Sequence, residues 1–257
     1  MLHHSKIQAI TLDLDDTLWP IMPVIVRAEQ SLQDWLQIHA PQTALLCALP
    51  DTKRAMRLQV EQRFPQFSHD LSFLRRESIR ASLVAAGDSP ELAETAFDVF
   101  FAARNAVSLY PGVADALAKL AARYPLVALS NGNADVFRTE AAPHFHSAVS
   151  ARAFGVAKPD VRIFHAAAAQ LNLDPECVLH VGDDAMADAF GALNAGMQAV
   201  WINAEGHVWE EKIASHASPP AGLNASPHPA SPRPALPHLK QPLTVRHLSE
   251  LCDHLLA

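Results

Sequence analysis

The chain has 257 residues, 49% of them hydrophobic, and a formal net charge of −7. This length allows one large domain or a core with a smaller unit beside it, and the apolar content is enough for a sizeable core. The negative charge argues against nucleic acid as a partner, and because no apolar run is long enough to cross a bilayer, we expect no membrane partner. Three widely spaced cysteines form no metal motif or disulfide framework, which predicts reduced thiols in the cytoplasm.

The first apolar run, residues 7–12, ends on the acidic stretch Asp13-Leu14-Asp15-Asp16-Thr17. This pattern predicts a buried strand that delivers carboxylates to the edge of a sheet, where open parallel sheets bind their ligands. Three acids within four residues repel one another away from water, so they need a cation or a shared proton.

Residues 20–109 have helical periodicity and no strand signal, which predicts an all-helical domain. The predicted helices cover residues 25–39, 44–64, 70–87 and 90–104. Gly87 is typical of the residue that follows the end of a helix. Ser89 and Pro90 are typical of an N-cap and a first helical position.

From residue 110 onward, short apolar runs alternate with helical stretches. The predicted strands cover residues 125–129, 147–150, 177–181 and 199–202. Such alternation predicts a Rossmann-like α/β core, a parallel sheet with helices on both faces, built from residues 1–19 and 110–257. The proline-rich stretch 216–242 is expected to be a mobile loop within this core, and a C-terminal helix is expected from residue 243.

Four polar clusters stand at the ends of predicted elements, and in a parallel sheet they can converge at one edge. They are 13–17, 130–133, 158–160 and 182–188. Each cluster alone is more often an ordinary turn or helix start. Together they supply carboxylates without nearby His or Cys, which favours Mg²⁺, and a lysine, a hydroxyl and backbone amides, which suit phosphate. The combination predicts Mg²⁺-dependent phosphoryl transfer.

The four clusters, in this order, resemble the four motifs of the haloacid dehalogenase superfamily. The matching residues are Asp13, Asp15 and Thr17; Ser130, Asn131 and Gly132; Lys158 and Pro159; and Gly182, Asp183 and Asp188. The helical block resembles the α-helical C1 cap of subfamily I. Core stretches 9–18, 124–133 and 179–184 resemble the bacterial flavin-pathway phosphatases, which act on 5-amino-6-(5-phospho-D-ribitylamino)uracil and FMN. This likeness is weaker in the cap, and the proline-rich stretch departs from it.

The resemblance implies a role for each motif residue. Asp13 would be the nucleophile that forms an aspartyl-phosphate, and Asp15, crowded by like charge, would act as acid and then base. Mg²⁺ would bind to Asp13, to the Asp15 carbonyl and to Asp183. Phosphate-binding residues would be Ser130, Asn131 and Lys158, and supporting residues would be Thr17, Asp184 and Asp188.

The substrate is expected to be a small phosphorylated metabolite, and the protein a monomer or a homodimer. The residues expected to face the substrate from the cap side are Trp19, Arg27, His69, Arg75 and Arg76. Asp16 has no role implied by the resemblance, and we expect it to cap a loop.

Three alternative functions remain open. A sugar phosphomutase shares all four motifs. A haloacid dehalogenase lacks a second acid at the position of Asp15, because a leaving halide needs no proton, so Asp15 favours a phosphatase. A non-catalytic binding protein of the same fold has little support, since all the expected acids are present.

Overall fold

The computed structural model describes residues 2–216 and 241–256 and contains one six-stranded sheet. The strand order is β3-β2-β1-β4-β5-β6, and all neighbouring strands are parallel. The strands are β1 (Ala9–Leu12), β2 (Leu126–Ser130), β3 (Ser147–Ser150), β4 (Val178–Gly182), β5 (Gln198–Ile202) and β6 (Leu243–Val245). The predicted α/β class is confirmed. The loop predicted over residues 216–242 lies almost entirely outside the described residues.

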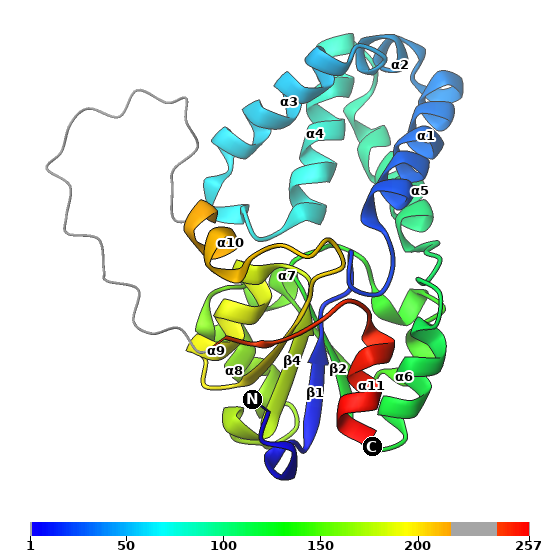
Figure 1. The fold of residues 1–257 in the computed structure, drawn as a ribbon. Helices are drawn as coiled ribbons and strands as arrows, with labels where there is room; N and C mark the ends of the chain where they lie inside the picture. Colours follow the sequence, from blue (N-terminus) through cyan, green and yellow to red (C-terminus); the bar gives the residue numbers. More distant parts are fainter. Residues whose placement is uncertain (1, 217–240, 257) are drawn as a thin grey trace, which may run out of the picture.

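Helices cover both faces of the sheet (Figure 1). One face carries α6 (Val113–Ala121) and α11 (Leu248–Leu256); the other carries α8 (Val161–Ala169), α9 (Gly191–Asn194) and α10 (Trp209–His216). Side chains alternate between the two faces along each strand. In β2, Leu126 and Ala128 join the apolar cluster that includes α6 and α11, while Val127 and Leu129 join the opposite cluster. Because both faces of the sheet are covered, the strands carry apolar side chains on both sides, as the sequence shows.

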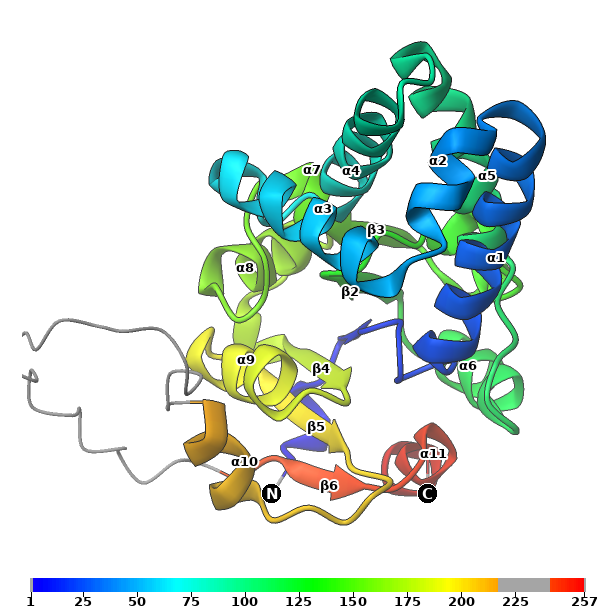
Figure 2. The same ribbon diagram turned by 90° about the horizontal axis from the view of Figure 1, so that it is seen from above.

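A helical layer lies over the carboxyl ends of the strands, and we call it the cap (Figures 1 and 2). It consists of α1 (Ile21–His39), α2 (Pro41–Cys47), α3 (Pro50–Arg63), α4 (Leu71–Ala86) and α5 (Ala93–Asn105). Its own apolar core includes Leu36 of α1, Leu83 of α4 and Phe100 of α5. Helix α4 begins where the Asp70 side chain accepts a hydrogen bond from the Phe73 N–H, and it ends at Gly87, whose φ is +82°.

Several element boundaries differ from the sequence prediction. The stretch 44–64 is two helices, because Pro50 has no N–H to continue α2 and instead opens α3. The segment after Ser89 is a 3₁₀ turn, Pro90–Leu92, before α5 begins, and the Ser89 side chain makes no capping bond. Residues 243–245, predicted to be helical, extend the sheet as β6 by pairing with β5. The alanine-rich helix before Gly196 is a π-helix, Ala185–Phe190, followed by α9.

The remaining short elements connect these parts. They are α7 (Ala151–Phe154) and 3₁₀ turns at His4–Lys6, Pro65–Phe67, Val136–Arg138, Ala142–His144 and Pro175–Cys177. None of the helices in the described part of the chain combines the length and the apolar character that a membrane span requires.

The docking of α11 can be tested by removing one core side chain. Leu251 is fully buried between α11 and the sheet, so Leu251→Ala should lower the free energy of unfolding by about 2–5 kcal/mol. Leu45→Ala, at a position 69% exposed, should have little effect. Chemical denaturation measures both variants. Equal, small changes would mean that the C-terminal helix does not pack as described.

Candidate active site

The polar ends of three neighbouring strands meet at the carboxyl edge of the sheet. Strand β1 lies between β2 and β4, and all three run in the same direction. Asp13 directly follows β1, Ser130 is the last residue of β2, and Asp183 directly follows β4. The topology therefore brings Asp13 together with two motifs that lie more than a hundred residues further along the chain.

Lys158 is the central charge of the site. Its Nζ lies 2.6 Å from Asp13 Oδ1 and 2.6 Å from Asp188 Oδ1, and its side chain is only 2% exposed. Burial by itself would lower the pKa of Lys158, but the two carboxylates outweigh it and hold the pKa above its usual value. The ammonium therefore stays charged.

Both carboxylate oxygens of Asp188 accept hydrogen bonds from groups of the protein. Its Oδ1 accepts hydrogen bonds from Lys158 and His180, and its Oδ2 accepts one from the Asp184 N–H at 3.0 Å. Burial opposes ionisation, yet Lys158 and His180 together hold the pKa of Asp188 below its usual range. A Cβ on Gly182 would collide with this carboxylate, so a glycine is required at position 182. This geometry suits the supporting role predicted for Asp188.

His180 is a site residue that the sequence did not reveal. It lies in the middle of β4 and is fully buried, with Nε2 3.1 Å from Asp188 Oδ1 and Nδ1 2.8 Å from Thr11 Oγ1. Burial lowers its pKa, so the ring is neutral. Because ionised Asp188 can only accept, the hydrogen-bond network places the ring proton on Nε2, and the Thr11 hydroxyl donates to Nδ1. The one sign of this role in the sequence is that His180 is a single polar residue within an apolar strand.

Asp13 and Asp188 share Lys158, and together with Asp183 they form the candidate metal site. Oxygen atoms of Asp13, Asp183 and Asp188 lie within 4.8 Å of one another. Burial raises the pKa of Asp13 well above its usual value, although Lys158 opposes the rise. Burial and the charge of Asp188 raise the pKa of Asp183 to about 7. The excess negative charge and the all-oxygen donor set fit Mg²⁺.

Asp15 points away from that cluster, towards the cap. Its Oδ1 accepts a hydrogen bond from Trp19 Nε1 at 2.8 Å, and its Oδ2 accepts one from Arg104 Nη2 at 2.5 Å. The sequence analysis expected neighbouring carboxylates to crowd Asp15. In the structure its two oxygens instead accept hydrogen bonds from Trp19 and Arg104. A Cβ on Gly132 would strike Asp15 Oδ2, so the loop after β2 must have a glycine there. The Asp15 carboxylate is outside the candidate metal cluster, which leaves its backbone carbonyl as the predicted ligand.

Arg104 is the second residue that sequence reasoning missed. It belongs to the last turn of α5, is 1% exposed, and also donates from Nε to Asn133 Oδ1 at 3.1 Å. It thereby joins the cap to the acidic loop and to the loop after β2. In the sequence it looks like any arginine near a helix end, and only the tertiary fold buries it.

Asn131 contacts Lys158 rather than an open phosphate site. Its Oδ1 accepts a hydrogen bond from the Lys158 N–H at 2.7 Å, and its Nδ2 donates to the Lys158 carbonyl at 2.9 Å. The side chain therefore holds the lysine loop in place, and phosphate binding by Asn131 stays a prediction for its backbone N–H. Ser130 Oγ accepts from the Gly132 N–H at 3.0 Å, which leaves its own O–H able to donate to a phosphate oxygen.

The other acidic-loop residues have local partners. Thr17 Oγ1 donates to Asp183 Oδ1 at 3.0 Å. The Asp16 side chain accepts from the Ile21 N–H at the start of α1, so Asp16 caps a helix, in line with the expected capping role. The Asp184 side chain accepts from two N–H groups at the start of the π-helix.

Two of the predicted substrate-facing residues are occupied by protein contacts. Trp19 is fully buried and holds Asp15, so it positions the acid and does not line the open cleft. The guanidinium of Arg27 donates to the Ala106 carbonyl at the end of α5. The prediction of direct substrate contact is corrected for Trp19, because its side chain is fully buried, whereas for the exposed Arg27 it stays a prediction.

The neighbouring arginines of α4 point in different directions. Arg76 lies 2.9 Å from Glu94 and over the ring of Phe97, within the cap. Arg75, about 100° away around the helix, borders the cleft between cap and core. His69 is half-buried in the turn before α4 and is not among the residues that line this cleft.

This cleft has a volume of about 210 Å³ and opens beside the acid. The core contributes Asp15, Gly132 and Asn133, and the cap contributes Ile25, Arg75, Phe100 and Arg104 among others. A group attached to a phosphate at Asp13 would therefore meet guanidinium groups and an aromatic ring.

A family model described as haloacid dehalogenase-like hydrolase matches residues 7–196. The chain belongs to this family. The match begins just before β1 and extends to the residue after α9's last turn, so it includes all four motifs and the cap. The geometry of Asp13, Lys158 and Asp183 can therefore be described as that of a haloacid dehalogenase-like hydrolase.

Comparisons with individual members of the family give two kinds of activity. The chain is 33% identical over 220 residues to 5-amino-6-(5-phospho-D-ribitylamino)uracil phosphatase YigB from Escherichia coli, covering 82% of this chain and 92% of that protein. It is 34% identical to a phosphoserine phosphatase from Thermus thermophilus, over 50% of this chain and 54% of that protein. A crystal structure named as 2-haloacid dehalogenase from Pseudomonas syringae is similar with a TM-score of 0.80 and 32% identity, covering 97% of this chain and 98% of that one.

The raised pKa of Asp183 predicts a pH-dependent response to Mg²⁺. Below pH 7 a proton occupies this ligand, so the apparent affinity for Mg²⁺ should fall about tenfold for each further pH unit. Without metal, the same raised pKa makes the folded state lose stability as the pH rises from about 4 to about 7. The increase in Tm caused by Mg²⁺ should therefore be larger at pH 8 than at pH 6.

Thermal unfolding with and without a few millimolar Mg²⁺ measures this effect. Asp183→Asn should remove most of the Mg²⁺ response at both pH values, whereas Asp174→Asn, at an exposed position, should keep it. Equal Tm increases at pH 6 and pH 8 in the unaltered protein would contradict the assignment of Asp183 as a ligand.

Proposed function

We propose that this protein is a Mg²⁺-dependent phosphatase that hydrolyses a small phosphorylated metabolite through an aspartyl-phosphate. The chain is a phosphoric monoester hydrolase of the haloacid dehalogenase-like family and acts in the cytoplasm. The observation that carries the proposal is the pairing of Asp13 with buried, charged Lys158 beside a second acid, Asp15, that faces the cleft. A nucleophile, a fixed positive charge and a separate acid are the groups that phosphate transfer to a carboxylate needs.

In the first step an Asp13 carboxylate oxygen attacks phosphorus. The new O–P bond forms as the bond from phosphorus to the leaving oxygen breaks, and Asp15 gives that oxygen a proton. Lys158 and the Ser130 hydroxyl hold phosphate oxygens during the transfer. Mg²⁺, held by Asp13 and Asp183, supplies charge neutralisation for the phosphate and the carboxylates.

In the second step water attacks the phosphorus of the aspartyl-phosphate. Asp15, now ionised, takes a proton from this water, and the bond between phosphorus and the Asp13 oxygen breaks. Inorganic phosphate leaves and the Asp13 carboxylate is restored. Trp19 and Arg104 keep the Asp15 side chain at the mouth of the cleft throughout.

The substrate we favour is 5-amino-6-(5-phospho-D-ribitylamino)uracil or FMN. The similarity to YigB along most of both chains supports this choice. The cleft supports it as well, because the guanidinium groups of Arg75 and Arg104 can bind hydroxyl and carbonyl oxygens, and Phe100 can contact a ring.

Dehalogenation deserves a direct test because a similar structure is named as a haloacid dehalogenase. Asp15 argues against it, since a halide leaves without a proton. Halide release from 2-chloropropionate should be absent. Rapid phosphate release from p-nitrophenyl phosphate would argue against a sugar phosphomutase, which must protect its aspartyl-phosphate from water.

The nucleophile is tested by Asp13→Asn. This nearly isosteric change should lower phosphate release by at least about a thousandfold, because an amide cannot form the aspartyl-phosphate. Asp253→Asn, at an exposed position of α11, should leave activity unchanged. The measurement is a phosphate-release screen over phosphorylated metabolites, including FMN and sugar phosphates, with and without Mg²⁺. Substantial turnover by a clean Asp13→Asn preparation would exclude Asp13 as the nucleophile.

Arg104 should affect the acid step more than phosphate binding. In Arg104→Met, Asp15 loses its donor from the cap, so esters that need a protonated leaving group should suffer most. We expect kcat/KM for alkyl phosphates to fall at least about tenfold more than kcat/KM for p-nitrophenyl phosphate, whose leaving group needs little protonation. Arg123→Met, at an exposed position, is the control. Equal losses on both esters would mean that Arg104 serves only the packing of the cap.

A further inference from the structure

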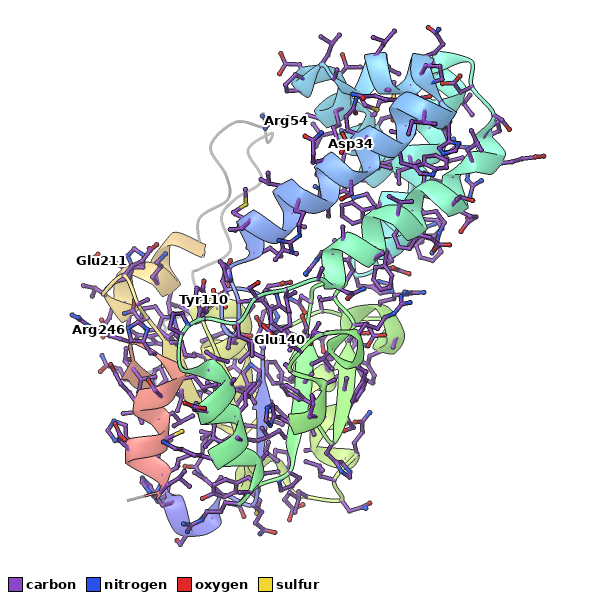
Figure 3. All side chains as sticks on the ribbon, turned by 90° about the vertical axis from the view of Figure 1, so that its right-hand side faces the viewer. Asp34, Arg54, Tyr110, Glu140, Glu211 and Arg246 are labelled. Carbon is purple, nitrogen blue, oxygen red and sulfur yellow. The ribbon has the colours of Figure 1, made fainter. Side chains whose placement is uncertain are left out.

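The cap contains a second cavity that the proposed reaction steps do not use. It has a volume of about 300 Å³, at the lower end of the usual range for small-molecule pockets, and lies among α1, α2, α3 and α4. Its apolar lining includes Leu32 and Leu36 of α1 and Ile79 of α4. Figure 3 shows Arg54, another lining residue, on the cap and away from Tyr110 near the sheet edge.

One face of α1 runs past both the cleft and this cavity. Ile21 and Ile25 line the cleft, and Glu29, Leu32 and Leu36 line the cavity. These residues are three or four apart, so they share one face of the helix. Eight residues separate Ile21 from Glu29, which corresponds to about 12 Å along the axis.

Helix α4 has a matching face on the other side. Leu71, Leu74 and Ser78 line the cleft, and Ser78, Ile79 and Ser82 line the cavity. In Figures 1 and 2, α4 lies between α3 and the side of the cap formed by α1 and α5. The cleft, which begins at Asp15, and the cavity are neighbouring spaces that share lining residues.

Three residues line both spaces and form a neck between them: Arg57, Arg75 and Ser78. Arg75 is held in place, because its Nη1 lies 2.6 Å from Glu29 Oε1 and its guanidinium lies 4.4 Å from the centre of the Phe100 ring. The neck therefore presents the N–H donors of two arginines, one of them held in place, and one small side chain, that of Ser78.

The lining of the cavity carries more positive than negative charge. Its cationic residues are Lys53, Arg54, Arg57 and Arg75, and Glu29 is its one acid among the described residues. Both Lys53 and Arg75 pair with Glu29. Donors along one wall and leucine and isoleucine side chains along another suit a flat ring that has carbonyl oxygens on its edge.

The hollow exists because small side chains face it. Ser82 is 5% exposed, and its hydroxyl donates to the Ser78 carbonyl of its own helix, so it fills little of the space. Ser78 of the neck and Thr43 and Cys47 of α2 are further small residues of the lining. A leucine in place of Ser82 would occupy part of the cavity without adding charge.

We propose that the leaving group of the substrate extends from Asp15 through the neck into this cavity. The enzyme would then select phosphomonoesters whose leaving group is long and ends in a flat ring bearing carbonyl oxygens. This assignment rests on the proposed phosphatase function and names the part of the cap that chooses the substrate. A short ester would reach the cleft but leave the cavity empty.

The test compares two phosphate esters that share the same phosphate end. FMN carries a ring on its ribityl chain, whereas D-ribitol 5-phosphate is the chain alone. In Ser82→Leu, the ratio of kcat/KM for FMN to kcat/KM for D-ribitol 5-phosphate should fall at least about tenfold, mainly through KM for FMN. Ala85→Leu, which adds the same bulk to an exposed position of α4 outside the cavity, should keep the ratio.

Binding of riboflavin, the dephosphorylated product of FMN, gives a readout that needs no catalysis. Unaltered protein and Ala85→Leu should bind riboflavin in a calorimetric titration, and Ser82→Leu should bind it at least about tenfold more weakly. If Ser82→Leu does not fold, Cys47→Leu fills the cavity from α2 and should give the same result.

The outcomes separate the two proposals. An unchanged ratio in both cavity variants, or no binding of riboflavin to the unaltered protein, overturns the cavity assignment while phosphate release still supports the phosphatase. The opposite outcome has two parts: the unaltered protein binds riboflavin and Ser82→Leu weakens this binding, but no phosphate is released from either ester. In that case the cavity assignment stands and the phosphatase proposal fails.

Discussion

The site depends on one buried ammonium shared by two buried carboxylates. A charge out of water is tolerated only when it is paired, and Lys158 meets Asp13 and Asp188 at 2.6 Å each. The residues around these two ion pairs hold their members in place. Asn131 fixes the backbone of the lysine, and His180 with Thr11 fixes the far side of Asp188. These contacts fix Lys158 directly or through Asp188, and Lys158 in turn fixes Asp13, the proposed nucleophile.

The network does not balance its own charge. Burial first, and then the charge of neighbouring carboxylates, raises the pKa values of Asp13 and Asp183, and Lys158 only partly opposes the rise at Asp13. Asp188 stays ionised, because Lys158 and His180 both donate to it and lower its pKa. A divalent cation would remove this conflict, and a phosphate group, itself negative, could enter only with such a cation present. The excess of carboxylates is the feature that fits a divalent cation at this edge of the sheet.

The sequence predicted the parts of the site that follow from strand ends. Parallel strands carry their carboxyl ends to one edge, so Asp13, Ser130 and Asp183 could be brought together before any coordinates were known. It did not predict contacts that depend on side-chain direction. Trp19 turned inward to Asp15, and Asn131 turned to the Lys158 backbone.

Other features could not be predicted because their environment is tertiary. Arg104 has the sequence surroundings of a solvated helix end, and it is buried only because the cap packs on the acidic loop. His180 resembles an ordinary strand residue until the π-helix brings Asp188 against it. The strand at 243–245 has a sequence pattern that is also compatible with a helix, and the open edge of β5 decides between them.

The position of the cap in the chain links substrate choice to chemistry. Residues 13–21 contain the proposed nucleophile, the proposed acid and the first residue of α1, whose N–H donates to the Asp16 side chain. At the other end of the cap, Arg104 returns to Asp15 only a few residues before the chain rejoins the core. The acid is therefore held between the two ends of the cap. In the proposed reaction the leaving group would lie beside Arg104, which both lines the cleft and binds Asp15, so one side chain would contact the leaving group and the group that protonates it.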